Sequence, residues 1–497
     1  MNLFKNLFIF EMANNHQGNL QHGLKIIKEM GNVAKKYKIN AAIKFQYRDL
    51  DSLVHPDYQD RNDVKHIPRF LSTRLEEEDY RKLAEAVRNE GMITITTPFD
   101  EPSVEMAIDH NIEIIKVASC SCSDWPLIET IAETQKPVIC SSGGSSIHEI
   151  DNLVSFFMHR EIELALMHCV GVYPSSNEIL HMNFVSKMIK RYPSTLVGWS
   201  GHEEPDNTDP IKIAVAKGAM LFERHVGLPT NEIKLNSYSM NPQEVEKWIE
   251  AALTSKSICG DNDEKVITEN ELESLLSLQR GVFANKPIKK GNEIKKEDIF
   301  FAMPCAENQL TSGEFGQKRT KYIATREYNL NEIIVEKPQT DKISSVRNII
   351  HDAKGMIYEA GIILGSDFDI ELSHHYGMEN FRETGVILVN IINRQYCKKL
   401  LIQLSGQKHP THLHKIKEET FQLLYGDLTV NIDNKEIQMF PGDKMLVEPN
   451  TWHSFRTQGG AIFEEISTRY LRDDSYYKDT AISRLDPMER KTVIDNW

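Results

Sequence analysis

Two apolar runs in the middle of the chain each end in side chains that can bind a metal ion. The run TLVGWSGH ends in Ser200 and His202, and the run GAMLFERH ends in Glu223, Arg224 and His225. A strand that is apolar along its length and polar at its carboxyl end is typical of a parallel barrel that carries a site. Two imidazoles at neighbouring strand ends could share one divalent ion. Both could instead cap their strands through local hydrogen bonds, and the other strands decide between these readings.

Lysine and hydroxyl side chains follow the other apolar runs in the first 200 residues. Lysines supply charge and hydroxyls supply directional hydrogen bonds, so a group of them at buried strand ends predicts a pocket for a small anion such as phosphate. A single lysine at such a place more often lies along the surface. The strand ends carry Glu11, Asn15, His16, Lys44, Gln46, Thr96, Thr97, Lys116, Ser119, Ser141, Ser142 and His168.

A second set of metal-ligand residues lies in the last fifth of the chain. His412, His414 and Glu419 stand in the pattern G-x5-HxH-x4-E-x6-G, and the later run PGDKMLVEPNTWH ends in His453. In a strand, His-x-His places both imidazoles on one face. Three imidazole nitrogens and one carboxylate suit Zn²⁺, Mn²⁺, Fe²⁺ or Ni²⁺. The pattern is that of a cupin barrel, although the same residues could line a barrel without a metal.

The elements that must position the first set alternate between strand and helix. Eight βα units in about 250 residues predict an α/β fold, a (β/α)8 TIM barrel. A doubly wound open sheet alternates in the same way, but its usual glycine-rich first turn is missing from EMANNHQGN. The expected strands are Leu7–Glu11, Ala41–Gln46, Met92–Thr97, Ile112–Ala118, Pro137–Ser141, Glu163–His168, Thr195–Ser200 and Ala219–His225.

The rest of the chain predicts two further domains. A polar stretch over about 255–280 reads as a connecting helix and linker. Beyond about residue 345, short alternating strands separated by turn residues predict a β-barrel. We therefore expect a barrel domain over 1–258, a small domain over 280–340 and a cupin over 345–497. The strands expected in the cupin are Val386–Asn390, Lys399–Leu404, Thr420–Tyr425, Leu428–Ile432 and Lys444–Val447.

Length and composition limit the function classes. A chain of 497 residues exceeds one core. A net charge of −14 argues against nucleic-acid binding. Seven thinly spread cysteines are typical of reduced thiols in the cytoplasm. No apolar run approaches the roughly 20 residues that span a membrane, and the start MNLFKNLFIFEM predicts a first strand rather than a signal peptide.

The ordered strand-end motifs resemble those of a known family. EMANNHQGN, IKFQ, TTPFD, IKVAS, KPVICSSGG, HCVGVYP, GWSGH and FERH resemble, in order and spacing, the motifs of the sialic acid (nonulosonic acid) synthases. The resemblance implies a transferase that condenses phosphoenolpyruvate with the open-chain aldehyde of an N-acylated amino sugar. The products would be a 3-deoxy-2-ulosonic acid and phosphate, in the biosynthesis of surface glycans of the bacterial type.

The resemblance also implies roles for individual residues. His202 and His225 would bind Mn²⁺ or Mg²⁺, and Glu11 would be a general base or a sugar ligand. These three form the catalytic set. The sugar would contact Asn15, Gln46 and Tyr173, and phosphoenolpyruvate would contact Lys44, Thr97, Lys116, Ser119, Ser141 and Ser200.

The second domain resembles the antifreeze-like SAF domain (a β-clip) of these synthases, through the run RGVFANKPIKKGNEIKKEDIFFAMP. The resemblance implies a domain-swapped homodimer in which this domain covers the partner's site. Met303 stands where the family has an arginine that reaches the acyl group of the sugar. Methionine donates no hydrogen bond, so we expect acyl recognition to differ.

Other family positions that face the sugar have changed as well. Ser121 stands where an acidic residue is usual, Gly171 replaces an asparagine, and Gly201 replaces the aspartate of the usual SDH tripeptide. Leu235 and Asn236 replace an Asp-His pair. Because the anion and metal positions are kept, we expect the same reaction on a different or modified sugar. A barrel that has lost catalysis is the alternative.

Two functions from other classes stay open at this point. The cupin could be a metal-dependent sugar isomerase or epimerase, since its fold alone selects no chemistry. The chain could also bind sugar without turning it over. In each case the expected partners are small molecules, with no nucleic acid and no membrane.

Overall fold

The computed structural model describes residues 3–59, 61, 63–260, 265–316, 320–340, 342–469, 471 and 474–495. Within these ranges the chain forms two compact units that divide between Lys265 and Val266. The first unit contains the predicted barrel, and the second contains the predicted small domain and the predicted cupin.

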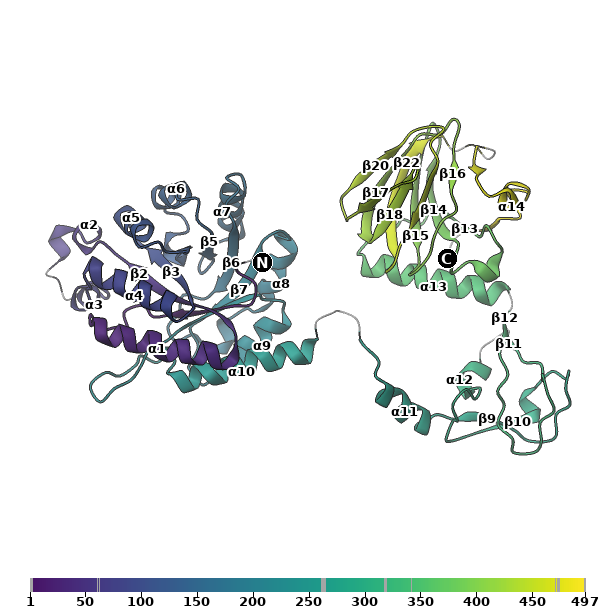
Figure 1. The fold of residues 1–497 in the computed structure, drawn as a ribbon, viewed down its shortest axis with the longest axis horizontal. Helices are drawn as coiled ribbons and strands as arrows, with labels where there is room; N and C mark the ends of the chain where they lie inside the picture. The colour runs from purple at the N-terminus through teal and green to yellow at the C-terminus, as the bar shows by residue number, and fades with distance from the viewer. Residues whose placement is uncertain are drawn as a thin grey trace. The chain divides into compact units, whose positions relative to one another are not determined.

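The first unit is a closed parallel barrel of eight strands in sequence order, surrounded by helices (Figure 1). This confirms the predicted TIM-barrel fold, with each strand within two residues of its predicted bounds. The strands are β1 Leu7–Glu11, β2 Asn40–Tyr47, β3 Ile93–Pro98, β4 Ile114–Val117, β5 Val138–Ser141, β6 Leu164–Cys169, β7 Leu196–Gly201 and β8 Leu221–His225. The helices are α1 Leu20–Tyr37, α2 Leu50–Leu53, α3 Ile67–Ser72, α4 Glu77–Asn89, α5 Glu101–Asp109, α6 Trp125–Glu133, α7 Ile147–Met158, α8 Asn183–Arg191, α9 Asp209–Ala216 and α10 Pro242–Cys259.

Alternation along the strands separates two apolar layers. Phe8 and Phe10 of β1 pack in the larger cluster with the surrounding helices, whereas Leu7 and Ile9 pack with Leu221 in a smaller cluster drawn from the barrel strands. Side chains two residues further along the inner face point the same way. Glu11 and Glu223 therefore stand one step above the apolar floor of the barrel.

Strand register brings these inner positions to one level. Glu11 is paired in register with Lys44 of β2 on one side and with His225 of β8 on the other. Ser200 of β7 is in register with Glu223. Because all eight strands are parallel, their carboxyl ends meet at one end of the barrel, where a (β/α)8 fold carries its site.

The first part of the second unit, residues 266–340, forms a small cluster of short strands. Its core includes Val282, Ile288, Ile294, Tyr322 and Ile334. The elements are α11 Glu269–Leu278, β9 Gly281–Ala284, β10 Ile299–Ala302, α12 Ser312–Phe315, β11 Thr320–Lys321 and β12 Gln339–Thr340. The assignment of this part as an SAF domain stays a prediction.

The rest of the second unit is helix α13 Lys342–Glu359 followed by two antiparallel sheets, the β-rich architecture predicted for a cupin. The seven-stranded sheet has the order β20-β17-β22-β15-β14-β13-β24, and the five-stranded sheet has the order β19-β18-β21-β16-β23. The elements are β13 Asp369–Ser373, β14 Val386–Asn393, β15 Tyr396–Gln403, β16 His412–Leu413, β17 Glu419–Gly426, β18 Leu428–Ile432, β19 Lys435–Met439, β20 Lys444–Val447, β21 His453–Arg456, β22 Ala461–Thr468, β23 Tyr476–Tyr477, α14 Thr480–Ser483 and β24 Lys491–Ile494.

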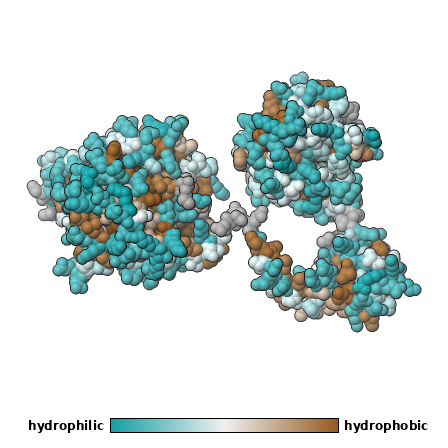
Figure 2. Space-filling model, in the orientation of Figure 1, coloured by the Kyte–Doolittle hydropathy of each residue, from teal (hydrophilic) through white to brown (hydrophobic). Residues whose placement is uncertain are grey.

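The visible surface of both units is mostly hydrophilic, with scattered apolar patches (Figure 2). One group of exposed apolar side chains lies at and just before α11, and includes Val266, Ile267, Leu272, Leu275 and Leu278. Among the described residues, every helix is too short or too polar to cross a membrane.

Candidate active site and metal centres

The carboxyl end of the barrel holds a buried network of two carboxylates and two lysines. Lys44 contacts Glu11, and its Nζ lies 3.1 Å from Oε1 of Glu223. Lys116 Nζ lies 2.5 Å from the same oxygen, and Ser200 Oγ donates a hydrogen bond to it at 2.9 Å. All five side chains are buried. The structure therefore brings together four residues predicted for the site and adds Glu223.

Glu223 has no role in the sequence-based assignment, although the run FERH contains it. The sequence could have predicted that Glu223 faces the site, because Leu221, Glu223 and His225 alternate along one face of a strand. Its neighbour Arg224 faces away from the site and forms a fully buried ion pair with Glu203, 2.7 Å from Nη1 to Oε1.

Burial and neighbouring charges push the two carboxyl pKa values apart. Burial raises the pKa of Glu11 above its ordinary value, and the opposing effect of Lys44 is smaller. Burial acts in the same direction on Glu223, but Lys116 and Lys44 together outweigh it and hold the pKa of Glu223 below its ordinary value. Glu223 is thus a fixed anion, whereas Glu11 is suited to accept and release a proton.

Several hydroxyl groups at this end of the barrel lack hydrogen-bond partners within the described part of the chain. Thr97 Oγ1 and Ser141 Oγ are buried in this state. Thr96 Oγ1 is also without a partner among the described residues, but Thr96 alternates along β3 with Ile95 of the inner layer and therefore faces outward. Ser119 Oγ accepts a hydrogen bond from the backbone N–H of Gly143 at 3.1 Å. Buried hydroxyls are nearly always paired in folded proteins, so donors left free beside two lysines fit an oxyanion ligand.

His202 and His225 lie together at the same end, with ring centroids 5.5 Å apart. His202 Nδ1 donates to the carbonyl of Val170 at 2.9 Å, which leaves Nε2 as the free ligand atom. Burial lowers the pKa of His202 to about 4 and the pKa of His225 well below its ordinary value. Both rings are therefore neutral at pH 7 and chemically fit a divalent ion.

The two histidines are not joined by further His, Cys, Asp or Glu ligands in a cluster of three or more, as far as the described residues go. A metal ion held by two protein ligands would keep most positions open for water or substrate, as catalytic sites do.

Aromatic rings flank the histidine pair. The Tyr173 ring lies 4.1 Å from His202, and the Tyr238 ring lies 5.1 Å from His225. The two tyrosine rings are 5.2 Å apart. Tyr173 is half-exposed, which suits its predicted contact with a sugar that enters from solvent. Tyr238 was missed by sequence reasoning, because nothing in its spacing marks it.

The other two predicted sugar residues have partners within the protein. Asn15 donates to the carbonyl of Val226 at 2.8 Å and to Ser239 Oγ at 3.0 Å, which ties the loop after β1 to the segment after β8. Gln46 accepts a hydrogen bond from Arg48 at 2.7 Å.

Arg48 is a further basic residue beside the site that the sequence did not single out. Its guanidinium lies between the rings of Phe70 and Phe99, 4.1 and 3.9 Å from their centroids. These stacking contacts fix the guanidinium next to the predicted sugar ligand Gln46.

Two of the changed family positions differ in their surroundings. A Cβ atom at Gly171 would meet nothing within 4 Å, so the space of the absent side chain is empty. A Cβ atom at Gly201 would lie 2.3 Å from Oε2 of Glu203. Gly201 thus makes room for the buried Glu203–Arg224 pair.

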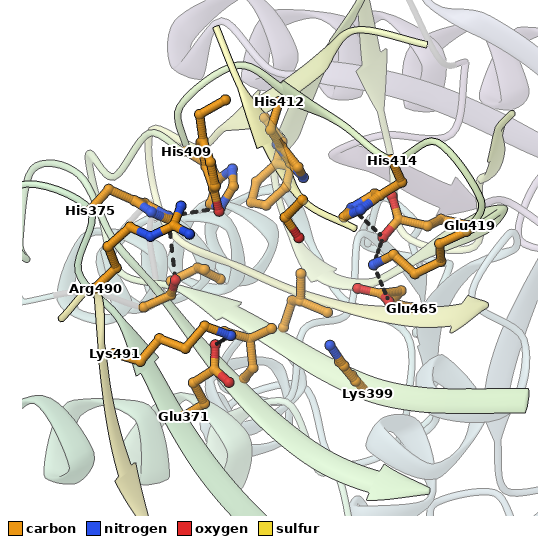
Figure 3. Close-up of a pocket in the computed structure, with 18 of the residues that line it drawn as sticks. Glu371, His375, Lys399, His409, His412, His414, Glu419, Glu465, Arg490 and Lys491 are labelled. Carbon is orange, nitrogen blue, oxygen red and sulfur yellow. Dashed lines mark hydrogen bonds and ion pairs between the residues drawn. The ribbon is translucent and has the colours of Figure 1, made fainter. Parts of the chain in front are cut away.

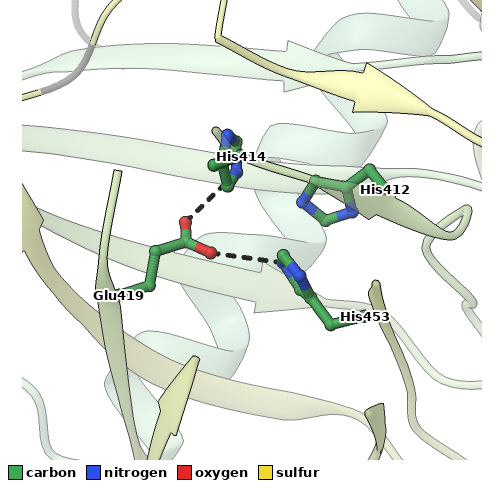
Figure 4. Close-up of side chains that lie close together, drawn as sticks. All are labelled: His412, His414, Glu419 and His453. Atoms are coloured by element: carbon green, nitrogen blue, oxygen red, sulfur yellow. Dashed lines mark ion pairs between the residues drawn. The ribbon is translucent and has the colours of Figure 1, made fainter. Parts of the chain in front are cut away.

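In the cupin, three histidines and one glutamate converge from β16 and the residue that follows it, from β17 and from β21 (Figure 4). His412 of β16 is in register with His453 of β21, and Glu419 begins β17. One ligand atom from each of His412, His414, Glu419 and His453 lies within 4.8 Å of the others. Glu419 is 3.5 Å from His414 Nε2 and 3.2 Å from His453 Nε2.

Backbone carbonyls fix the orientation of these imidazoles. The Nδ1 atoms of His412, His414 and His453 are 3.1, 2.7 and 3.1 Å from the carbonyls of Pro410, Asp474 and Thr451. Such bonds leave every Nε2 as an acceptor, the arrangement found around bound metals. His453 Nε2 and Glu419 Oε2 are buried without a hydrogen-bond partner among the described residues, so the cluster fits a divalent ion.

Comparisons with known proteins match a family model to part of each unit. The NeuB family model matches residues 31–264, and the Cupin domain model matches residues 400–467. The crystal structure of a candidate spore coat polysaccharide biosynthesis protein E from Chromobacterium violaceum is 42% identical, with a TM-score of 0.63, over 66% of this chain and 98% of that one.

Two relatives extend the comparison. An uncharacterized protein of Methanocaldococcus jannaschii is 30% identical over 298 residues, which are 60% of this chain and 84% of the relative. The N,N'-diacetyllegionaminic acid synthase of Legionella pneumophila is 26% identical over 313 residues, 60% of this chain and 85% of the relative. The ordered strand-end motifs, the closed barrel and these matches agree. The chain belongs to the NeuB family and carries a cupin domain in addition.

Proposed function

We propose that the barrel condenses phosphoenolpyruvate with the open-chain aldehyde of an N-acylated amino sugar. The products are a 3-deoxy-2-ulosonic acid and phosphate. The observation that carries the proposal is the meeting of two buried lysines, unpaired hydroxyls and two neutral histidines at one end of the barrel. A relative in the same family is a legionaminic acid synthase, which supports a sugar-acid product.

The charges at the strand ends are consistent with a multiply charged anion that binds together with a metal ion. Glu11 and Glu223 balance Lys44 and Lys116, so the strand ends have little net charge of their own. Phosphoenolpyruvate is a multiply charged anion, and a divalent ion at the histidine pair would compensate part of its charge. When bound, that ion would also polarise the aldehyde oxygen as a Lewis acid.

The residues of the chain then have separate roles. Lys44, Lys116 and the hydroxyls of Thr97 and Ser141 would hold the carboxylate and phosphate groups, so that C3 faces the aldehyde carbon. The C2=C3 electron pair of phosphoenolpyruvate forms the new C–C bond, the former aldehyde oxygen takes up a proton to become a hydroxyl, and positive charge is left at C2. Water adds to C2 and gives one proton to Glu11. The resulting C2 hydroxyl loses its proton as the C2–O bond to phosphate breaks, which leaves a ketone and free phosphate.

The finer expectations from the sequence remain proposals. They are the use of phosphoenolpyruvate, a role in surface glycan biosynthesis, Mn²⁺ or Mg²⁺ as the barrel metal, an SAF domain over 280–340, a domain-swapped homodimer and a cytoplasmic location. The empty space at Gly171 supports an acceptor sugar that differs from the common one.

Mass spectrometry tests the synthase reaction directly. The full chain is incubated with Mn²⁺, phosphoenolpyruvate and a panel of aldoses and N-acylated amino sugars, and released phosphate is measured in parallel. We expect a product heavier than one sugar by a pyruvate unit. His225→Ala should abolish it, whereas His159→Ala, at an exposed helix end, should not. Sugar binding without any phosphate release would contradict the proposal.

A second candidate function belongs to the cupin, as a sugar isomerase or epimerase. It is favoured by the three charged side chains at the metal-ligand cluster, where Lys417 contacts Glu419 and lies 3.2 Å from Glu465. Such a reaction would change retention time at constant mass without phosphoenolpyruvate. It should disappear in His412→Ala and persist in His225→Ala. If neither reaction is observed in either assay, sugar binding without turnover is the remaining function.

A further inference from the structure

The interior of the cupin is lined by charged side chains as well as by the metal-ligand cluster (Figure 3). Its carboxylates all have lysine partners. Glu371 lies 2.8 Å from Lys491, and Lys417 holds both Glu419 and Glu465. The charged residues of the lining are Glu371, Lys399, Lys417, Glu419, Glu465, Arg490 and Lys491. Cations therefore exceed anions even before a metal binds.

Arg490 has no acidic partner among the described residues. The residue is 8% exposed, its side chain faces the pocket beside His375, and its Nε has no hydrogen-bond partner in the described part of the chain. Its Cζ lies 4.9 Å from the ring centroid of Tyr477. A buried guanidinium without an anion is unfavourable, so this position is suited to a bound oxyanion.

Arg490 belongs to a part of the cupin that the family model does not cover. It directly precedes β24, which adds to the sheet beside β13, and its carbonyl accepts a hydrogen bond from the backbone N–H of His374 at 2.8 Å. The match to cupins spans residues 400–467. His375 follows β13 and Arg490 precedes β24, on either side of that range, so the match does not cover this wall of the pocket.

A row of histidines connects Arg490 with the metal-ligand cluster. His375 Nε2 lies 3.0 Å from His409 Nε2, and the rings of His409 and His412 are 4.6 Å apart. His412 is one of the four proposed metal ligands. The guanidinium and residues of the cluster thus line one pocket.

We propose that the cupin binds an anionic sugar, whose carboxylate or phosphate is held by Arg490 while its hydroxyl or carbonyl oxygens face the His412–His414–Glu419–His453 cluster. Guanidinium binds both oxyanions in a two-pronged geometry. A sugar acid is the form we favour, because the proposed product of the barrel carries a carboxylate that the acceptor sugar lacks. This choice rests on the proposed synthase function, whereas the recognition of an anion does not.

Calorimetric titration of the metal-loaded full chain tests the proposal with four probes. N-acetylneuraminate is a sugar acid, its methyl ester is uncharged, mannose 6-phosphate is a sugar phosphate, and N-acetylmannosamine is neutral. The proteins are wild type, Arg490→Gln, Arg490→Lys and, as a matched control, Arg394→Gln in the exposed turn between β14 and β15. The barrel contributes equally to all of them, so differences between the proteins isolate the cupin.

We expect Arg490→Gln to weaken N-acetylneuraminate at least about tenfold, the size of a lost charge-assisted bond, and to leave the neutral sugar and the ester unchanged. Arg490→Lys keeps the charge, so its affinity for N-acetylneuraminate should lie between those of wild type and Arg490→Gln. If Arg490→Gln does not fold, the affinity of Arg490→Lys tests the proposal. A stronger loss for mannose 6-phosphate would assign a sugar phosphate instead. Equal binding of both anions by wild type and folded Arg490 variants would overturn the proposal.

The same variants separate this inference from the synthase function. Arg490→Gln should still release phosphate from phosphoenolpyruvate in the barrel assay. If the barrel assay fails in wild type while Arg490-dependent binding persists, the synthase proposal falls and anion recognition stands.

Discussion

Glu223 lies between the two lysines of the barrel site and fixes their positions. Glu223→Gln would leave two buried lysine charges with one carboxylate. Removing one partner of a buried ion pair costs about 3 kcal/mol or more. We therefore expect a lower unfolding temperature and a larger stabilisation by added phosphoenolpyruvate than in wild type. The control Glu246→Gln breaks the exposed pair with Lys36 and should cost less than about 1 kcal/mol.

Glu11 is the residue whose raised pKa links the site to pH. As a base it must be deprotonated, so kcat should fall as the pH falls through a pKa above the ordinary value of a glutamate. Glu11→Gln should lower kcat about 10²- to 10⁴-fold and remove this acidic limb. The measurement is kcat against pH for both proteins. An unchanged acidic limb in the variant would assign it to another group.

The two changed glycines give a matched pair of stability tests. Gly201→Ala would place a methyl group 2.3 Å from Glu203 Oε2 and disrupt its buried pair with Arg224. We expect a loss of about 3 kcal/mol or more in unfolding free energy. Gly171→Ala meets no atom within 4 Å and should change it by less than about 0.5 kcal/mol. Equal losses in urea unfolding would contradict this account of Gly201.

At the scale of elements, strands with a regular apolar pattern could be predicted from the sequence, whereas contacts between residues far apart in the chain could not. The barrel strands were found because each is an apolar run with a polar end, and β18 and β20 were predicted with their observed bounds. Glu223 lies in a recognised motif, but its contact with Lys116 spans 107 residues. Local sequence patterns do not report such long-range pairings.

The short strands around the cupin pocket show the same limit. β16, β23 and β24 have two to four residues each and exist through pairing with distant strands. Their sequences carry no complete alternation, and so the strands were not predicted. The grouping of His412, His414, Glu419 and His453 followed from the spacing of the cupin pattern, whereas the buried Arg490 had no motif to mark it.

The strands β16, β17 and β21 carry ligand atoms of the proposed metal cluster, so we expect a bound metal to stabilise the cupin. An ion that binds only the folded cluster stabilises it by about 2.7 kcal/mol at 100 times its dissociation constant. We expect Zn²⁺, Mn²⁺ or Ni²⁺ to raise the unfolding temperature of the cupin and a chelator to reverse this. His453→Ala should abolish the shift, and His351→Ala, on the exposed face of α13, should keep it. A full shift in His453→Ala would exclude this cluster.

At the scale of the whole molecule, each of the two units buries a neutral histidine that makes it sensitive to acid. Burial lowers the pKa of His16 in the barrel to about 4, and Gly18 donates its N–H to the Nδ1 of that ring. Burial lowers the pKa of His375 in the cupin to about 3. The unfolded chain has an ordinary histidine pKa near 6.5. Between these values the unfolded state binds more protons, so acid favours unfolding of both units.

The expected contribution of His16 to this loss is about 3 kcal/mol as the pH falls from 6.5 to 4, since one pKa unit corresponds to about 1.4 kcal/mol. His16→Asn keeps an acceptor for the Gly18 N–H but cannot take up the proton. Urea unfolding at several pH values should therefore show a shallower pH dependence of the barrel transition in His16→Asn. His375→Gln should flatten only the cupin transition. Parallel pH profiles for wild type and both variants would mean that other groups cause the acid sensitivity.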